Sequence, residues 1–346
     1  MFSNECPVPI ADTERILLGH GSGGKLTARL IEQHILPALG NPILNALDDQ
    51  AIIPVSGSRI AFTTDSYVIT PLFFRGGDIG ELAVNGTIND LAMGGARPLA
   101  LSLAFIIEEG LPLATLDRVL DSVRRAADRA GVRVVTGDTK VVGRCSADQM
   151  FINTAGIGVV ADGVKISSSR VAAGDAILLS GPIGDHGVAV LSQRENLEFE
   201  GEFASDTAPL HDLVSSMLAT CADIHAMRDP TRGGVAASLV EIASRRNVTI
   251  VVDEETLPIR DTVRGACEIL GLDPLFVANE GKLIAFVPER DADVVLAAMR
   301  AHPLGRDAVR IGAVVDDQGG IVRLRTPIGG ERIIDLPFSE LLPRIC

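Results

Sequence analysis

The most glycine-dense stretch of the chain is Gly19-His20-Gly21-Ser22-Gly23-Gly24-Lys25, directly before a helix-like segment over 26–35. Glycines let several backbone N–H groups converge on an anion, and Ser22 and Lys25 add a hydroxyl donor and a positive charge. The spacing is not that of a Walker A phosphate loop. On spacing alone, a phosphate-binding loop and a plain flexible loop are equally open.

A second group of candidates consists of aspartates at the ends of apolar segments. Asp65 follows a predicted strand over 60–64, Asp138 follows another over 132–135, and Asp48 and Asp49 follow an apolar stretch. Carboxylates that face an anion-binding loop are what Mg²⁺ with a nucleoside triphosphate needs. Any single aspartate is more often a solvated turn residue, so this prediction depends on the whole set.

Asp90 is the most informative of these aspartates. It lies in the last turn of a helix predicted to begin after Asp78 and to stop at Gly94-Gly95. A carboxylate there opposes the helix dipole by roughly 0.3 to 1 kcal/mol, so a compensating partner is expected. The pattern Asp-x-x-x-Gly-Gly recurs at Asp229, an echo that chance also explains.

The chain ends in a proline-flanked tail. From Leu336 it runs Leu-Pro-Phe-Ser-Glu-Leu-Leu-Pro-Arg-Ile-Cys, and Pro337 and Pro343 oppose a continuous helix. Eleven extended residues reach roughly 35 Å, so a thiol at Cys346 could travel between the surface and a cleft. The alternative is an incidental free thiol. Prenylation is excluded because its signal needs a cysteine fourth from the end.

Composition narrows the partners. The chain has 346 residues and a formal charge of -14, which argues against nucleic acid or an anionic membrane as the main partner. With 11 Phe, 1 Tyr and no Trp, base-stacking platforms are not expected. The five cysteines contain no CxxC pair, so neither a disulfide framework nor a zinc site is predicted. No bilayer-spanning segment and no signal peptide are visible, so a cytoplasmic location is expected.

The order of elements predicts a mixed fold. The length suggests two domains, and strand-like and helix-like stretches alternate in both halves, as in an α/β or α+β protein. A boundary is plausible near 162–174. The predicted helices of the second half are 184–194, 209–222, 234–246 and 290–301, and its predicted strands are 176–180, 248–252, 283–287, 309–315 and 321–324.

Taken together, the motifs resemble the HypE family of hydrogenase maturation factors. This family is part of the superfamily of aminoimidazole ribonucleotide synthetase, selenophosphate synthetase and thiamine-monophosphate kinase. The resemblance covers essentially the whole chain, and the cysteine at the terminus points to HypE within the superfamily. The motifs are GHGSGGK (19–25), DDQA (48–51), TTDSYV (63–68), GELAVNGTINDLAMGGA (80–96), TGDTKVV (136–142), RDPTRGG (228–234), NEGK (279–282) and PRIC (343–346).

The resemblance implies an α+β, PurM-like fold with two domains of mixed sheets flanked by helices. It implies an ATP-binding and dimerisation domain over 1–165, a C-terminal domain over 166–335, and a mobile tail over 336–346 that carries the acceptor cysteine. The implied partners are a second copy of the chain, the carbamoyltransferase HypF, and the HypC-HypD complex as cyanide acceptor.

The resemblance also implies a reaction. A carbamoyl group on Cys346 is dehydrated with ATP to a thiocyanate, whose cyanide becomes a ligand of the [NiFe] hydrogenase iron. Lys140 and Glu280 are implied as bases, together with Cys346 as catalytic residues. The implied ATP-binding residues are Gly21, Ser22, Gly23, Gly24, Lys25, Asn89, Gly137 and Thr139. The implied Mg²⁺ ligands are Asp48, Asp49, Asp65, Asp90, Asp138 and Asp229.

Two other functions remain open on the sequence. One is another activity of the superfamily, such as a small-molecule kinase or a purine-pathway synthetase, for which Cys346 would be dispensable. The other is a nucleotide-gated carrier, in which the tail thiol ferries a one-carbon group and ATP only switches its position.

Overall fold

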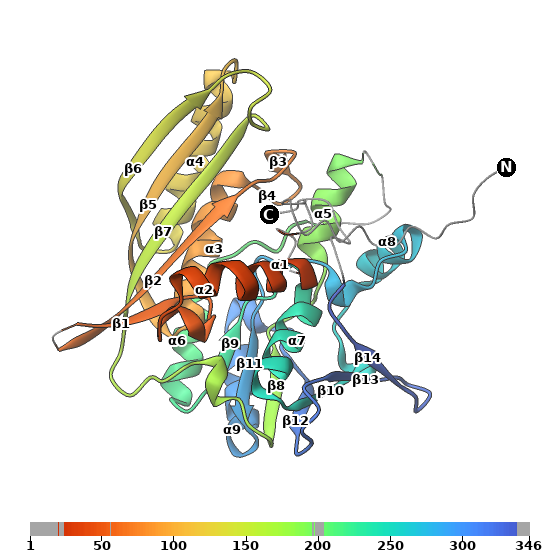
Figure 1. Ribbon diagram of the computed structural model, residues 1–346. Coiled ribbons are helices and arrows are strands. Elements are labelled where there is room, and N and C mark those ends of the chain that lie inside the picture. The colour runs from red at the N-terminus through yellow and green to blue at the C-terminus, as the bar shows by residue number, and fades with distance from the viewer. Residues whose placement is uncertain (1–19, 21–23, 56, 196, 198–203, 338–346) are drawn as a thin grey trace.

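The computed structural model describes residues 20, 24–55, 57–195, 197 and 204–337. Gly21, Ser22, Gly23 and Cys346 therefore lie outside the described residues. Within the described ranges the chain forms two mixed sheets flanked by helices (Figure 1), which confirms the predicted α+β fold. No helix in these ranges is long and apolar enough to cross a membrane.

The N-terminal half is built on a five-stranded sheet in the part of the chain that is described, with strand order β1-β2-β7-β5-β6. β5 and β6 run parallel, and the other neighbouring pairs are antiparallel. β6 is an edge strand, and nearly all of its residues are exposed. The strands are β1 (Ala51–Val55), β2 (Ser58–Tyr67), β5 (Ala96–Glu108), β6 (Arg133–Val142) and β7 (Met150–Val160), beside the small hairpin β3 (Phe73–Phe74) and β4 (Gly77–Asp78).

The C-terminal half is built on a second sheet, of seven strands among the described residues, in the order β14-β13-β10-β12-β8-β11-β9. Its interior strand β8 is buried along its whole length, as expected for a strand covered on both faces. The strands are β8 (Asp175–Leu179), β9 (Ala226–Arg228), β10 (Thr249–Asp253), β11 (Ile284–Pro288), β12 (Val309–Val315), β13 (Val322–Arg325) and β14 (Glu331–Ile334).

Helices cover both sheets (Figure 1). α3 and α4 pack on the N-terminal sheet, while α7 and the pair α6 and α9 pack on the C-terminal sheet. The helices are α1 (Lys25–Leu30) and α2 (Leu36–Leu39), joined by a π-helical turn, then α3 (Ile79–Met93), α4 (Leu113–Arg129), α5 (Asp185–Arg194), α6 (His211–Thr220), α7 (Gly234–Arg246), α8 (Asp261–Leu270) and α9 (Glu289–Ala301).

Helix α3 begins and ends where the sequence predicts. The carboxylate of Asp78 accepts hydrogen bonds from the N–H groups of Gly80 and Glu81, at 2.8 and 3.1 Å, which caps the helix. Gly94 follows its last residue. The cap fixes the residue at which α3 begins. Because α3 is almost completely buried, its starting point also determines where Asp90 lies against the rest of the protein.

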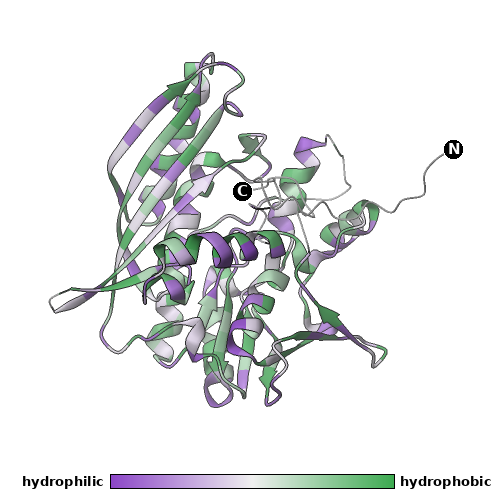
Figure 2. Ribbon diagram, in the orientation of Figure 1, coloured by the Kyte–Doolittle hydropathy of each residue, from purple (hydrophilic) through white to green (hydrophobic). Residues whose placement is uncertain are grey.

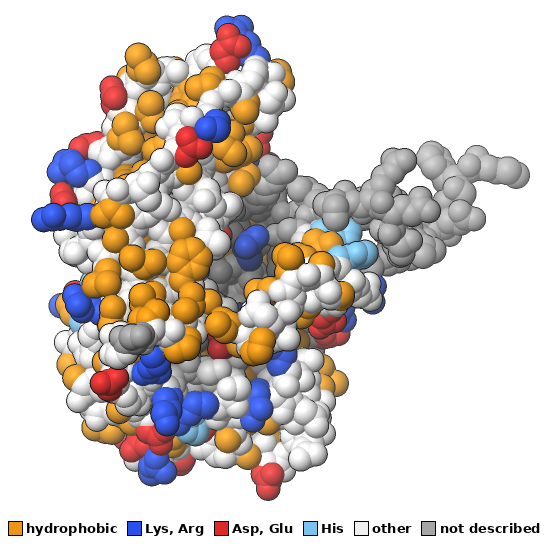
Figure 3. All heavy atoms as spheres, turned by 60° about the vertical axis from the view of Figure 1, so that its left-hand side comes forward, with side chains coloured by type: hydrophobic (Ala, Val, Ile, Leu, Met, Phe, Trp, Pro, Cys, Tyr) orange, Lys and Arg blue, Asp and Glu red, His pale blue; other side chains and the backbone are white. Residues whose placement is uncertain are grey.

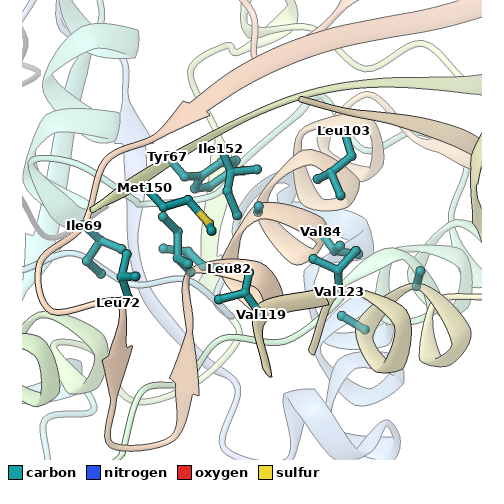
Figure 4. Packing of buried hydrophobic residues seen from close by; sticks show 14 of the residues in the cluster. Tyr67, Ile69, Leu72, Leu82, Val84, Leu103, Val119, Val123, Met150 and Ile152 are labelled. Atoms are coloured by element: carbon teal, nitrogen blue, oxygen red, sulfur yellow. The ribbon is translucent and has the colours of Figure 1, made fainter. Parts of the chain in front are cut away.

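Two of the four hydrophobic clusters among the described residues extend across both halves. Figure 2 shows hydrophobic residues spread through both halves, and Figure 4 shows Leu82 and Val119 of the helices packed near Met150 and Ile152 of β7. A second cluster joins the end of α3 to α6, α9 and the C-terminal sheet. The halves are therefore held together by apolar packing as well as by polar contacts.

Two expectations about strand ends are wrong. Asp65 lies inside β2, which continues to Tyr67, and Asp138 lies in the middle of β6, which continues to Val142. Residues 136–140 are polar and typical of a turn, but they form part of β6. An edge strand can keep such side chains in solvent. The sequence pattern also did not predict β5 or α8.

Gly86 tests the packing of α3 against β2. A Cβ atom at this position would lie 2.3 Å from the hydroxyl oxygen of Tyr67. We expect Gly86→Ala to lower the free energy of unfolding by about 1–2 kcal/mol, because the clash outweighs the helix propensity of alanine. Tyr67→Phe removes the hydroxyl that causes the clash. Urea denaturation should therefore show that Gly86→Ala lowers the free energy of unfolding at most half as much in the Tyr67→Phe protein as in the wild type. No recovery would contradict this explanation.

Candidate active site

A small cavity between the two halves is lined by acidic side chains from both. Asp65 comes from β2 and Asp90 from α3, while Asp229 follows β9 and Glu280 precedes β11. Its volume of about 30 Å³ has room for water molecules or an ion, but not for a nucleotide. The other lining residues are Ser66, Tyr67, Gly86, Thr231 and Arg232.

The segment after β9 is shaped by two glycines. Gly233 and Gly234 have φ of 76° and 62°, in the left-handed region that glycine tolerates best. A Cβ atom at Gly234 would also lie 2.5 Å from the carbonyl oxygen of Leu275. The resulting tight turn starts α7 immediately after Thr231 and Arg232 and keeps Asp229 at the cavity.

Burial and mutual repulsion dominate the electrostatics of this cavity. Burial raises the pKa of Asp90 well above its usual value, and the charges of Asp229 and Asp49 raise it further. Burial, followed by the charges of Asp229 and Asp206, likewise raises the pKa of Glu280. Burial raises the pKa of Asp229 to about 6, although Arg228 opposes this shift. The hydroxyl of Thr63 donates a hydrogen bond to Asp90 at 2.7 Å.

Asp49 lies beside the cavity in an ion pair with Arg228. The Arg228 guanidinium is 2.8 Å from the Asp49 carboxylate and 3.2 Å from that of Glu241, and its side chain is 14% exposed. Burial nevertheless raises the pKa of Asp49 to about 8, against the attraction of Arg228. Arg228 was not among the predicted site residues, although it belongs to the motif at 228–234.

Asp48 has partners in the second half of the chain. Its carboxylate accepts hydrogen bonds from Ser167 Oγ at 2.8 Å and from the backbone N–H of Ser168 at 3.1 Å. It therefore fastens the loop before β1 to the 3₁₀ turn Ser168–Arg170. Asp48 does not line the cavity, and its role as a metal ligand stays a prediction.

Asp138 and Lys140 lie together on β6 and do not line the cavity of their own chain. Their side chains form an exposed ion pair of 2.9 Å. Thr139 is on the same exposed strand. Gly137 faces β5 closely, since a Cβ atom there would lie 2.1 Å from the carbonyl oxygen of Leu103. The roles of these β6 residues in ATP binding, metal binding and catalysis stay predictions.

The predicted nucleotide-binding residues Asn89 and Lys25 make contacts that join the two halves. The Asn89 side chain donates to the carbonyl oxygens of Ala208 and Glu280, at 3.1 and 3.2 Å, and accepts from the Leu210 N–H at 2.8 Å. Lys25 forms an ion pair with Asp335 near the other end of the chain. Gly24 directly precedes α1.

The acidic residues are not arranged as a closed metal site. No group of three or more His, Cys, Asp or Glu side chains in the described ranges is already placed to hold a metal ion. Four carboxylate oxygens are buried without a hydrogen-bond partner among the described residues. Two of them, Glu280 Oε1 and Asp49 Oδ2, lie at the cavity or beside it, and the other two belong to Asp185 and Asp206. Such orphaned acceptors are costly, and a cation would satisfy them.

Comparison with known proteins accounts for most of the chain. Residues 47–160 match the family described as AIR synthase related protein, N-terminal domain, and residues 172–325 match the corresponding C-terminal domain. A relative from Cupriavidus necator, carbamoyl dehydratase HypE, is 53% identical over 333 residues, which cover 96% of this chain and 95% of that protein. The chain belongs to the HypE family of carbamoyl dehydratases.

Solved HypE structures share the fold. A HypE-HypF complex contains a chain with a TM-score of 0.85 and 46% identity, covering 89% of this chain and 99% of that one. A structure of HypE in complex with ATP has a TM-score of 0.81 and 48% identity, covering 96% of this chain and 100% of that one. The chain is thus a carbamoyl dehydratase of the HypE family with a PurM-like fold of two domains.

Two Asp→Asn substitutions should change stability in opposite directions. Because the pKa of Asp90 is raised in the folded state, the wild type loses free energy of unfolding as pH rises above the usual aspartate range. Asp90→Asn removes this loss, so in EDTA at pH 8 it should stabilise the protein by about 1–2 kcal/mol, and by less at pH 4.

Asp48→Asn is the matched comparison. It removes an oxygen that accepts hydrogen bonds from Ser167 and Ser168, so it should destabilise the protein by about 1 kcal/mol. Urea denaturation at both pH values measures the two variants. A destabilised Asp90→Asn at pH 8 would show that the carboxylates in the cavity do not repel one another.

Proposed function

We propose that this chain uses ATP to dehydrate an S-carbamoyl group on its own Cys346 to a thiocyanate, which supplies the cyanide ligands of the [NiFe] hydrogenase iron. The observation that carries the proposal is the cavity between the two halves, to which both contribute carboxylates. The name of its relatives, carbamoyl dehydratase, and the ATP complex of one of them support the same reaction.

The proposed chemistry requires two proton removals. The carbamoyl oxygen is a poor leaving group, so it attacks the γ-phosphorus of ATP and displaces ADP. The product is an iminophosphate, formed with loss of one N–H proton. The C–O bond then breaks, phosphate leaves with the bonding electrons, and loss of the second N–H proton gives the S–C≡N group. Glu280 is our candidate for accepting one of these protons, and Lys140 for assisting the other.

The donor set at the cavity fits Mg²⁺. Mg²⁺ prefers carboxylate oxygens, and the cavity offers desolvated carboxylates whose mutual repulsion a cation would relieve. We propose that Asp65, Asp90 and Asp229 hold it, with Asp49 beside them. When bound, Mg²⁺ neutralises negative charge on the phosphate oxygens. Asp48 and Asp138 remain more distant candidates.

The start of the tail lies beside the start of α1. The Lys25 N–H donates to the carbonyl oxygen of Pro337 at 3.1 Å, and Lys25 is ion-paired with Asp335. Nine further residues reach roughly 30 Å when extended. We therefore propose that Cys346 is delivered from this point, next to the glycine-rich segment 21–25 that binds the phosphates. The proposed tail is 336–346, after domains 1–165 and 166–335.

We further propose that the chain forms a homodimer through its N-terminal sheet. Figure 3 shows hydrophobic side chains gathered on the face that this sheet turns to solvent. Val135 and Val141 of the edge strand β6 are 64% and 67% exposed, and an exposed edge of this kind favours pairing with another strand. A second copy on this face would bring Asp138 and Lys140 toward its partner's site, while Thr139 lies on the opposite face of β6, paired with the buried Phe105.

Further partners follow from the reaction. A carbamoyltransferase of the HypF type would load Cys346, in line with the HypE-HypF complex of a relative. A HypC-HypD complex would accept the cyanide on iron, and we place these steps in the cytoplasm.

The loss of water should depend on Cys346. In protein carbamoylated at this residue, addition of ATP should lower the intact mass by the mass of one water, and Cys346→Ser should show no such change. Cys145→Ser, at an exposed cysteine, is the control and should behave as wild type. Normal ATP turnover by Cys346→Ser would favour another activity of the superfamily. ATP binding without loss of water would favour a nucleotide-gated carrier.

A heterodimer of two variants tests whether Lys140 serves the partner's site. Lys140→Ala and Glu280→Ala homodimers should each be inactive. A purified heterodimer of the two variants has one site with both residues intact, so it should retain about half of the wild-type activity. An inactive heterodimer would contradict a contribution of Lys140 across the interface. The single-variant homodimers, carrying the same tags, are the controls.

A further inference from the structure

The segment 204–209, which we term the strap, crosses between the two halves beside the cavity. One side of the strap is hydrogen-bonded to the N-terminal half of the chain. The Ser205 N–H donates to the carbonyl oxygen of Arg75 at 2.8 Å, and the Asn85 side chain donates to Thr207 Oγ1 at 3.1 Å. The Asn89 side chain donates to the carbonyl oxygen of Ala208 at 3.1 Å. The strap is therefore fixed to the loop after β3 and to α3.

The opposite side of the strap rests on the loop that carries Glu280. Asp206 accepts a hydrogen bond from the Glu280 N–H at 3.0 Å, and its other oxygen is 3.0 Å from Lys282 Nζ. Both charged side chains are largely buried, with exposed fractions of 4% for Asp206 and 12% for Lys282. A Cβ atom at Gly281 would lie 1.8 Å from the Asp206 carbonyl oxygen, so this close approach requires glycine.

These contacts hold the backbone of Glu280 on both sides. Its N–H is bound by Asp206, and its carbonyl oxygen accepts from the Asn89 side chain at 3.2 Å. The side chain of Glu280 is left to point into the cavity, where Oε1 is buried without a hydrogen-bond partner among the described residues. The position of this carboxylate thus depends on the contacts of its own backbone.

A buried ion pair is a poor source of stability, because apolar residues of similar volume often stabilise a protein as well or better. Asp206 contacts the residues on both sides of Gly281, namely the Glu280 N–H and the Lys282 side chain. We propose that Asp206 is a positioning residue of the reaction, which fixes the Glu280 carboxylate in the cavity through its hydrogen bond with the Glu280 N–H. This inference rests on the proposed function, in which Glu280 accepts a proton.

The test uses full-length protein carbamoylated at Cys346 and measures the single-turnover rate of water loss over a range of ATP concentrations. Asp206→Ala removes both contacts, so the rate at saturating ATP should fall about 100-fold, while the ATP concentration for half-maximal rate should stay within about twofold. Asp206→Asn keeps an acceptor for the Glu280 N–H but turns an amide toward Lys282. Asp206→Asn/Lys282→Met removes that conflict and should recover most of the rate.

Asp175→Asn is the matched control. Asp175 is also a buried aspartate of the C-terminal half, paired with His225 at 2.9 Å, and it does not line the cavity. It should lower stability without lowering the rate of the folded protein. If Asp206→Ala keeps a rate within about threefold of wild type, or if the double variant is as slow as Asp206→Ala while folded, the positioning role is wrong.

Glu280→Gln, measured in parallel, separates this inference from the proposed function. A slow Glu280→Gln with a fast Asp206→Ala would reject the role of Asp206 and keep that of Glu280. A fast Glu280→Gln would reject the proposed role of Glu280, and the role of Asp206 with it.

Discussion

The structure is organised around like charges that are buried together where its two halves meet. Asp65 and Asp90 come from one half, and Asp229 and Glu280 come from the other. Burial of a carboxylate costs free energy, and a neighbouring carboxylate increases the cost, as the raised pKa values of Asp90 and Glu280 reflect. A chain would not hold this arrangement unless the surrounding structure enforced it and a cation or substrate made use of it.

The surrounding structure enforces it by several independent means. Hydrophobic packing joins α3 to the C-terminal sheet, so the halves cannot separate without exposing apolar surface. Arg228 forms an ion pair with Asp49 and so offsets part of the negative charge beside the cavity. Asn89 binds the backbone at Ala208 and Glu280, so the helix that carries Asp90 is also attached to the loop that carries Glu280. The contacts that join the two halves therefore also hold the carboxylates of the cavity together.

Much of the fold could be predicted from sequence because local signals were strong. Helix α3 begins after the Asp78 cap and ends before Gly94, as predicted. The predicted helix over 234–246 and the predicted strand over 309–315 match α7 and β12. Strand β6 was cut short because Thr136 to Lys140 have the composition of a turn, and only its place at the sheet edge explains a strand there. Asp206 gave no signal, because the sequence around it is that of an ordinary polar loop.

The sequence by itself determined the candidates for chemistry: the motifs with their aspartates, the NEGK segment with Glu280, and a cysteine as the last residue. These are covalent facts that hold in any conformation. The tertiary structure decided which candidates meet. It gathers Asp65, Asp90, Asp229 and Glu280 in one cavity, although up to 215 residues separate them in sequence (65 to 280), and it leaves Asp138 and Lys140 on an exposed edge. The physical reason is that proximity between distant residues follows from strand order and packing, which no local pattern encodes.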